Sequence, residues 1–196
     1  MPKFICISGK AGHGKDTLAE ILRCELENSG KTVLVTHFAD LLKYICSNYF
    51  AWNGLKDERG RSLLQYVGTD IVRKRNPNYW VNFIVQLISM FKDEWDYVII
   101  PDARFPNELA QIKKKFDLVH VRVVRGVSGA RMTVQQLAHE SETALDGIEP
   151  DYLVDNTGSF DHLRKQARSL LFNIRFAGDD PQQISMFGED IINDES

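Results

Sequence analysis

A short glycine-rich segment near the start of the chain limits its fold more than any other feature. Residues 9–17, with the sequence GKAGHGKDT, fit the pattern G-x-x-x-x-G-K, and Asp16 stands where serine or threonine is usual. An apolar run at residues 4–8 predicts a buried strand before the segment, and helical spacing over residues 18–26 predicts a helix after it. The glycines allow the backbone to close around a phosphate, while the helix N-terminus and Lys15 add positive charge. The segment therefore predicts a phosphate-binding loop between a strand and a helix.

The spacing of Gly9, Gly12 and Gly14 does not match G-x-G-x-x-G, which excludes a dinucleotide-binding fingerprint. Hydrophobic patterning predicts further strands at residues 31–36, 97–100, 118–124 and 152–154. It predicts helices at residues 39–49, 62–75, 79–92, 106–116 and 160–176, and a loop at 52–60. Because strands alternate with helices and are apolar on both faces, we predict an α/β fold with a doubly wound, mostly parallel five-stranded sheet.

Composition and charge narrow the classes of function. The 196 residues suit one soluble domain over residues 1–176, followed by an acidic C-terminal tail over 177–196. Removing the six acidic residues of the tail changes the formal net charge from −3 to +3, which suits small anionic substrates but is too weak to predict direct nucleic-acid binding. Three cysteines without a C-x-x-C pair, no signal peptide and no membrane-spanning run lead us to expect a cytoplasmic protein that binds no membrane.

A polar cluster follows the predicted strand at residues 97–100. Asp102 is placed to hold Mg²⁺ or its water, as the second motif of nucleotide-binding proteins does, although it could instead cap the helix that starts at Pro106. Arg104 is a candidate phosphate clamp, since a guanidinium matches phosphate oxygens, with a solvated surface position as the alternative. Glu108 is expected at the same edge of the sheet.

Several blocks, taken in order, resemble the phage-type deoxynucleoside monophosphate kinases of the P-loop kinase group. Beyond the GKDT ending of the loop, whose aspartate is itself typical of that family, the blocks are HFADLLK (37–43), LQYVGTD (64–70), NYWV (78–81), YVIIPDARFPNE (97–108), VVR (123–125), HESE (139–142) and DNTGS (155–159). No single block after the loop is specific, whereas their order and spacing together are. The resemblance ends near Phe176.

The resemblance implies a P-loop kinase fold that uses ATP and Mg²⁺ to phosphorylate a nucleoside monophosphate. The acceptor phosphate is already ionised near neutral pH, so the site must supply positioning and positive charge rather than a strong base. A small lid is implied at about residues 126–147, a polar segment flanked by Arg125 and containing Arg131. His139, Glu140 and Glu142 do not predict a metal site, because neither a cysteine nor a second histidine lies near them in the sequence.

Residue roles carry over from the family at matching positions. We assign the ATP site to Gly9, Gly12, His13, Gly14, Lys15, Asp16, Thr17, Arg125, Asn156 and Gly158. We assign the acceptor site to Lys10, Lys43, Arg61, Gln65, Thr69, Trp80, Asp102, Arg104 and Glu108. The metal ligands are drawn from Asp16, Thr17 and Asp102, and the catalytic groups are Lys15, Asp102, Arg104 and Arg125. Trp80 could instead belong to the core, and Asn156 with Gly158 could form a plain turn.

Other functions stay open at this point. Phosphomevalonate kinase and dephospho-coenzyme A kinase share related loops, but residues 64–70 and 79–80 favour a nucleotide acceptor. A non-catalytic nucleotide-binding protein of the replication machinery is the third alternative, against which Lys15, Arg104 and Arg125 argue. The tail segment Gln183–Phe187 (QISMF) resembles the pentapeptide by which bacterial replication proteins dock on the sliding clamp, with packing on the body as the alternative. Whether the chain forms a homodimer, and whether it acts in a bacterium or a phage-infected host, is left open.

Overall fold

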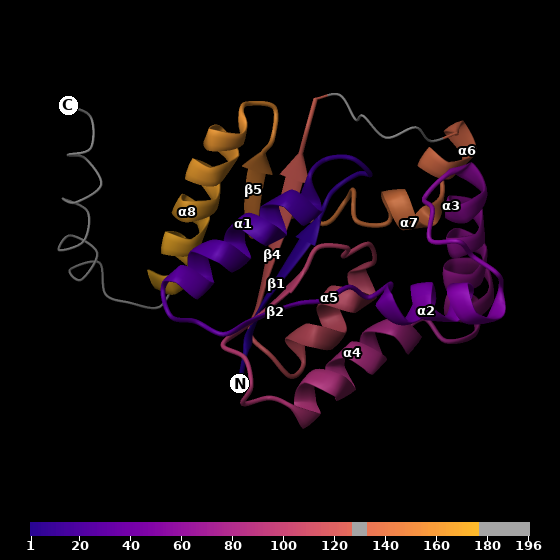
Figure 1. Cartoon of the computed structure of the whole chain (residues 1–196), viewed down its shortest axis with the longest axis horizontal. Helices are drawn as coiled ribbons and strands as arrows, with labels where there is room; N and C mark the ends of the chain where they lie inside the picture. The colour runs from indigo at the N-terminus through magenta and orange to yellow at the C-terminus, as the bar shows by residue number, and fades with distance from the viewer. Residues whose placement is uncertain (127–132, 177–196) are drawn as a thin grey trace.

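A computed structural model describes residues 1–126 and 133–176, and it contains the predicted parallel sheet (Figure 1). Its strands are β1 (Lys3–Ser8), β2 (Val33–Val35), β3 (Tyr97–Ile100), β4 (Leu118–Val124) and β5 (Tyr152–Asp155). All pair in parallel in the order β2-β3-β1-β4-β5, which confirms the predicted fold class. β1 therefore lies at the centre, and the phosphate loop leaves its carboxyl end at the point where the strand order reverses, which is where α/β sheets bind ligands.

Helices cover both faces of the sheet. They are α1 (Lys15–Asn28), α2 (Asp40–Tyr49), α3 (Glu58–Gln65), α4 (Tyr79–Met90), α5 (Pro106–Lys113), α6 (Val134–Leu137), α7 (Glu140–Thr143) and α8 (Phe160–Phe176), with a π-helix η1 (Tyr66–Arg73) after α3. Alternate residues of β1 point to opposite faces: Ile5 and Ile7 pack with α1 and α8, whereas Phe4 and Cys6 pack with α2, α4 and α5. Burial on both faces explains why the inner strands β1, β3 and β4 are mostly apolar.

Two predictions about the elements before α4 were wrong. Residues 52–60 were predicted as a loop, but α3 begins at Glu58, because the Asp57 carboxylate accepts a hydrogen bond from the Gly60 N–H at 2.7 Å and caps the helix. Residues 62–75 were predicted as one α-helix, yet η1 replaces its second half. A π-helix widens the backbone spiral and is frequent at functional sites. Here it brings Gly68 against Leu42, so closely that an added Cβ would lie 2.6 Å from the leucine side chain.

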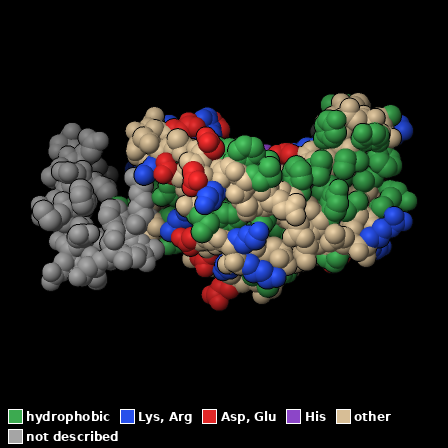
Figure 2. All heavy atoms as spheres, turned by 90° about the horizontal axis from the view of Figure 1, so that it is seen from below, with side chains coloured by type: hydrophobic (Ala, Val, Ile, Leu, Met, Phe, Trp, Pro, Cys, Tyr) green, Lys and Arg blue, Asp and Glu red, His purple; other side chains and the backbone are tan. Residues whose placement is uncertain are grey.

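Hydrophobic side chains gather on the surface at the end of the molecule that carries α2, α3 and η1 (Figure 2). This end includes the exposed aromatic side chains of Tyr44, Tyr49 and Tyr66. Among residues 1–126 and 133–176, no helix combines the length and the apolar character needed to cross a membrane. The predicted lid is described only at Gly126 and from residue 133 onward, while Arg131 and the clamp-like segment Gln183–Phe187 lie outside the described residues.

Candidate active site

The phosphate loop adopts a backbone that only glycine tolerates at its two ends. Gly9 has a φ of 141° and Gly14 a φ of 93°, both in the region that L side chains rarely adopt. An added Cβ would lie 2.4 Å from the Val123 carbonyl oxygen at Gly9 and 2.3 Å from the Asn156 amide nitrogen at Gly14. The Asn156 side chain also donates a hydrogen bond to the His13 carbonyl at 2.9 Å. β4 and the turn after β5 thus hold the loop in shape.

Lys15 begins α1 and is 8% exposed. Its Nζ donates to the carbonyl oxygens of Gly9 at 2.7 Å and Lys10 at 3.0 Å, so the ammonium bridges the loop from inside. Burial, followed by the positive charge of Arg104, lowers the pKa of Lys15 from 10.5 to about 8. The negative charge of a phosphate beside Lys15 would raise this pKa and favour the charged ammonium.

Asp16 follows Lys15 and pairs with His37, which the sequence analysis did not single out. The His37 Nε2 lies 3.0 Å from Asp16 Oδ1, and its Nδ1 lies 3.5 Å from Asp40 Oδ1. Although burial opposes the charged imidazolium, hydrogen bonds to Asp16 and Asp40 raise the pKa of His37 to about 9. The hydrogen bond from His37 in turn lowers the pKa of Asp16, which therefore stays ionised. The aspartate at this position of the loop is held in place by a cation from the segment before α2.

Asp102 connects the end of β3 to the start of α2. Its Oδ1 accepts a hydrogen bond from the Phe38 N–H at 2.9 Å and its Oδ2 accepts one from the Ala39 N–H at 3.0 Å. Both hydrogen bonds go to the residues that lead into α2, so Asp102 fixes the approach to that helix and does not cap the helix that starts at Pro106. Each carboxylate oxygen keeps a lone pair, and the side chain lines the same cavity as Asp16.

Glu108 is fully buried and organises the loop that presents Arg104. Its Oε2 accepts hydrogen bonds from the backbone N–H groups of Arg104 at 2.7 Å and Phe105 at 3.0 Å, and its Oε1 pairs with Arg73. The Arg73 guanidinium lies 4.0 Å from the centre of the Phe105 ring, a cation–π contact. Burial raises the pKa of Glu108, while Arg73 opposes this shift. The geometry gives Glu108 a role in positioning Arg104, which lines the cavity described below.

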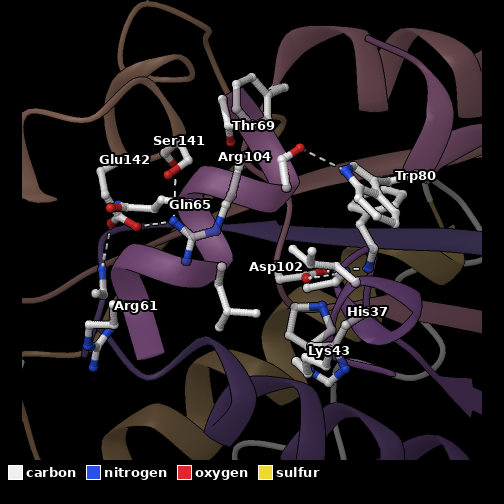
Figure 3. A pocket seen from close by; sticks show the side chains of 18 of the residues that line it. His37, Lys43, Arg61, Gln65, Thr69, Trp80, Asp102, Arg104, Ser141 and Glu142 are labelled. Atoms are coloured by element: carbon white, nitrogen blue, oxygen red, sulfur yellow. Dashed lines mark hydrogen bonds and ion pairs between the residues drawn. The ribbon is translucent and has the colours of Figure 1, made fainter. Parts of the chain in front are cut away.

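A cavity of about 240 Å³ joins the phosphate loop to the predicted acceptor residues (Figure 3). Ala11, Gly12 and Lys15 line one end of it. The other predicted site residues in its wall are Asp16, Lys43, Arg61, Gln65, Thr69, Trp80, Asp102, Arg104 and Glu108. Side chains that are widely separated in the sequence thus converge on one space at the carboxyl edge of the sheet.

The side chains of Arg61, Gln65, Thr69 and Trp80 in the cavity wall differ in their burial and in their hydrogen-bond partners. Arg61 carries a buried Nε that has no hydrogen-bond partner within residues 1–126 and 133–176. Thr69 is 7% exposed, and Gln65 donates a 3.4 Å hydrogen bond to the Gln136 carbonyl. Trp80 is 2% exposed and its indole N–H donates to the Gly68 carbonyl at 3.0 Å, so it belongs to the core and contributes to the cavity wall.

Other predicted residues lie away from this cavity. Thr17 is exposed on α1, and Arg125 is exposed directly after β4. Gly158 packs on His162, whose side chain would lie 3.0 Å from an added Cβ. Lys10 points toward the α7 segment, where its Nζ pairs with Asp146 Oδ1 at 2.6 Å. Lys10 is therefore held by the segment around α7 and is not among the residues that line the cavity.

Four charged residues that line the cavity were not assigned to the site by the sequence analysis: His37, Lys56, Arg73 and Glu142. His37 and Glu142 fall inside recognised blocks, but the partners that reveal their roles, Asp16 and Arg104, are distant in the sequence. A titratable residue close to the carboxyl end of a strand, like His37 after β2, is a sequence signal that could have identified a residue of the cavity. Nothing in the local pattern around Arg73 predicts its buried pairing.

The sequence matches one family model, described as deoxynucleotide monophosphate kinase, over residues 47–167. This match covers more than half of the chain. The chain belongs to this family. The matched region starts after the phosphate loop, so it is independent of the G-x-x-x-x-G-K motif, and it includes Arg61, Gln65 and Thr69 of the cavity wall. Together with the loop, family membership makes the chain a P-loop phosphotransferase.

Several solved structures share the fold of this chain, although their sequences are only distantly similar to it. An APS kinase from Mycobacterium tuberculosis aligns with a TM-score of 0.51 and 15% identity, over 87% of this chain and 96% of that one. A sugar kinase from Janibacter sp. HTCC2649 aligns with a TM-score of 0.53 and 14% identity, over 87% of this chain and 95% of that one. These likenesses establish the P-loop kinase fold alone. No curated protein matches the sequence.

Proposed function

We propose that this protein transfers the terminal phosphoryl group of ATP to a deoxynucleoside monophosphate, giving ADP and a deoxynucleoside diphosphate. The observation that carries the proposal is the single cavity lined at one end by Ala11, Gly12 and Lys15 and at the other by acceptor-side residues. A phosphoryl group held by the loop would face an acceptor held in the same cavity. Such proximity is the main requirement of the reaction, because the acceptor oxygen is already ionised.

The acceptor end has the chemistry that a nucleotide needs. Lys43, Arg61 and Arg104 supply positive charge for the monophosphate, and the unpartnered Nε of Arg61, among the described residues, is one donor available to an anion. Gln65 and Thr69 offer hydrogen-bonding groups for the base or sugar. In the reaction, an oxygen of the monophosphate forms a bond to the terminal phosphorus of ATP as the bond to ADP breaks. Lys15 and the loop N–H groups stabilise the charge that develops.

Mg²⁺ fits the residues that are present. The ion prefers oxygen ligands and needs only one or two carboxylates in addition to phosphate oxygens and water. Asp16 and Asp102 both line the cavity beside Lys15, and we propose that they hold the ion, directly or through water. The ion would neutralise phosphate charge during transfer. Thr17, which is exposed on α1, is a weaker candidate ligand.

The decisive assay follows ADP formation from ATP and Mg²⁺ with a panel of acceptors. The panel contains all common deoxynucleoside and ribonucleoside monophosphates together with phosphomevalonate and dephospho-coenzyme A. Turnover with at least one deoxynucleoside monophosphate, and its loss in the Lys15→Ala variant, is expected. Turnover only with a non-nucleotide acceptor would replace the proposed substrate, and turnover with none would contradict the proposal.

A further inference from the structure

The carboxylate of Glu142 is buried in the cavity beside Arg104 rather than in solvent (Figure 3). Its side chain is 3% exposed and its Oε1 forms an ion pair with Arg104. Its Oε2 accepts a hydrogen bond from the backbone N–H of Ala11 in the loop at 3.3 Å. Arg104 also donates to the neighbouring Ser141 carbonyl at 2.9 Å. A negative charge from α7 thus bridges a loop amide and a phosphate-clamp candidate.

The α7 segment is tied to the loop by a second set of contacts. The Lys10 Nζ donates to the Glu142 carbonyl oxygen at 2.6 Å and to the Asp146 carboxylate at 2.6 Å. Glu142 therefore reaches the loop because its backbone is anchored there, not through a chance rotamer of a mobile surface side chain. Its burial next to two positively polarised groups is the environment that a bound anion requires.

The two groups that Glu142 engages, the Ala11 N–H and Arg104, are the kind of groups that bind a phosphate. Backbone N–H groups of such a loop bind phosphate oxygens, and Ala11 lines the cavity together with Arg104 and Glu142. The terminal phosphate of the donor must lie in this cavity to reach the acceptor. We propose that Glu142 is an internal ligand of the transferred-phosphate site, which occupies the Ala11 amide and Arg104 until the terminal phosphate of ATP displaces it. This inference rests on the proposed ATP site.

The arrangement has a consequence that distinguishes ATP from ADP. ATP must displace the carboxylate to place its terminal phosphate, whereas ADP lacks that phosphate and leaves Glu142 in contact with Ala11 and Arg104. The internal anion therefore lowers affinity for ATP selectively, since a competing ligand contributes only its advantage over the group that it replaces. Removal of the negative charge should raise ATP affinity and leave ADP affinity nearly unchanged.

The test is calorimetric binding of ATP and of ADP to the full chain, without acceptor and with the metal chelated. Glu142→Gln keeps the size of the side chain and removes its charge, and Glu140→Gln, an exposed position in the same helix α7, is the matched control. A hydrogen bond to a charged group is worth enough to predict ATP affinity higher by about 10-fold in Glu142→Gln. Glu142→Asp, whose carboxylate is shorter by one methylene, should show a smaller rise and provides a second variant should Glu142→Gln fold poorly.

The outcomes separate this inference from the proposed function. Selective tightening of ATP in Glu142→Gln, absent in Glu140→Gln, supports displacement. Weaker ATP binding, an equal change for both nucleotides or an equal effect of the control would overturn it, because a group that only supports the site or contributes general charge would behave in these ways. If the wild type binds ATP and shows turnover, but Glu142→Gln has the same ratio of ATP affinity to ADP affinity as the wild type, the inference alone is overturned. If neither the wild type nor any variant binds a nucleotide, the inference and the proposed function are both overturned.

Discussion

We predict that His120 makes the folded state of this protein sensitive to mild acid. It lies in β4, is 2% exposed, and its Nε2 is 2.8 Å from the Ser8 hydroxyl of β1, one residue before the phosphate loop. Burial, and then the positive charge of Arg122, lower the pKa of His120 from 6.5 to about 4, although Asp151 partly opposes the shift. The folded protein therefore keeps His120 neutral at pH values where an exposed histidine is protonated.

The sign and size of the effect follow from these two pKa values. Between pH 6.5 and about 4 the unfolded chain binds a proton at His120 that the folded chain does not bind. The free energy of unfolding therefore falls as the pH decreases through this window, and the contribution of His120 is fully present only above it. Linkage with these values removes about 2 kcal/mol between about pH 7 and pH 5, and about 3 kcal/mol once the pH lies below the window.

Urea unfolding of the wild type and of His120→Gln at several pH values from 7 to 5 measures this term. Glutamine does not titrate, and its amide can still hydrogen-bond the Ser8 hydroxyl. On acidification from about pH 7 to pH 5 the wild type should therefore lose about 2 kcal/mol more unfolding free energy than His120→Gln does. The exposed His162 of α8 provides the control variant His162→Gln, which should follow the wild type. Parallel curves for wild type and His120→Gln would refute the reasoning.

Three further predictions concern activity. Lys15→Ala should reduce turnover by about 100-fold or more because it removes a buried charge aimed at the transferred group, while circular dichroism shows a folded protein; near-normal turnover would exclude Lys15 from catalysis. Arg104→Lys keeps the charge but loses the guanidinium fork, so the KM for the monophosphate should rise more than that for ATP, and the reverse result would exchange the two site assignments. Truncation after Gly178 should leave steady-state rates unchanged, because the tail supplies no predicted site residue; a slower truncated enzyme would give the tail a role in catalysis.

The elements that the sequence predicted correctly are those whose signals are local. β3 and β4 were predicted with their observed bounds, because a continuous apolar run between polar residues marks a strand buried on both faces. The strand, loop and helix around Lys15 were predicted because glycine spacing encodes the loop backbone directly. The π-helix was missed because apolar spacing does not distinguish it from an α-helix, and its close approach of Gly68 to Leu42 joins residues far apart in the sequence.

The sequence placed many of the residues that line the cavity, but not the contacts between them. Residues from the loop, α3, η1 and the loop after β3 do line one cavity, as their positions at the carboxyl edge of a parallel sheet require. The pairs Asp16–His37 and Arg104–Glu142 depend on which segments meet in three dimensions, and the hydrophobic periodicity of the sequence gives no information about such contacts. The bonds of Asp102 to the α2 N-terminus and of Glu108 to the Arg104 backbone were invisible for the same reason.

The resting site compensates most of its positive charges with its own anions. The pairs in or beside the cavity are Lys10–Asp146, His37–Asp16, Lys43–Asp40, Arg73–Glu108 and Arg104–Glu142. The partly exposed pairs add little to stability, so their main effect is on ligands. When a single phosphate replaces one of these carboxylates, the binding free energy that it gains is only the difference between two similar interactions, that of the cation with the phosphate and that of the cation with the carboxylate. A ligand set that engages the loop, the clamp and the acceptor cations together gains from several exchanges at once, which favours simultaneous occupation by a polyphosphate donor and a monophosphate acceptor over either alone.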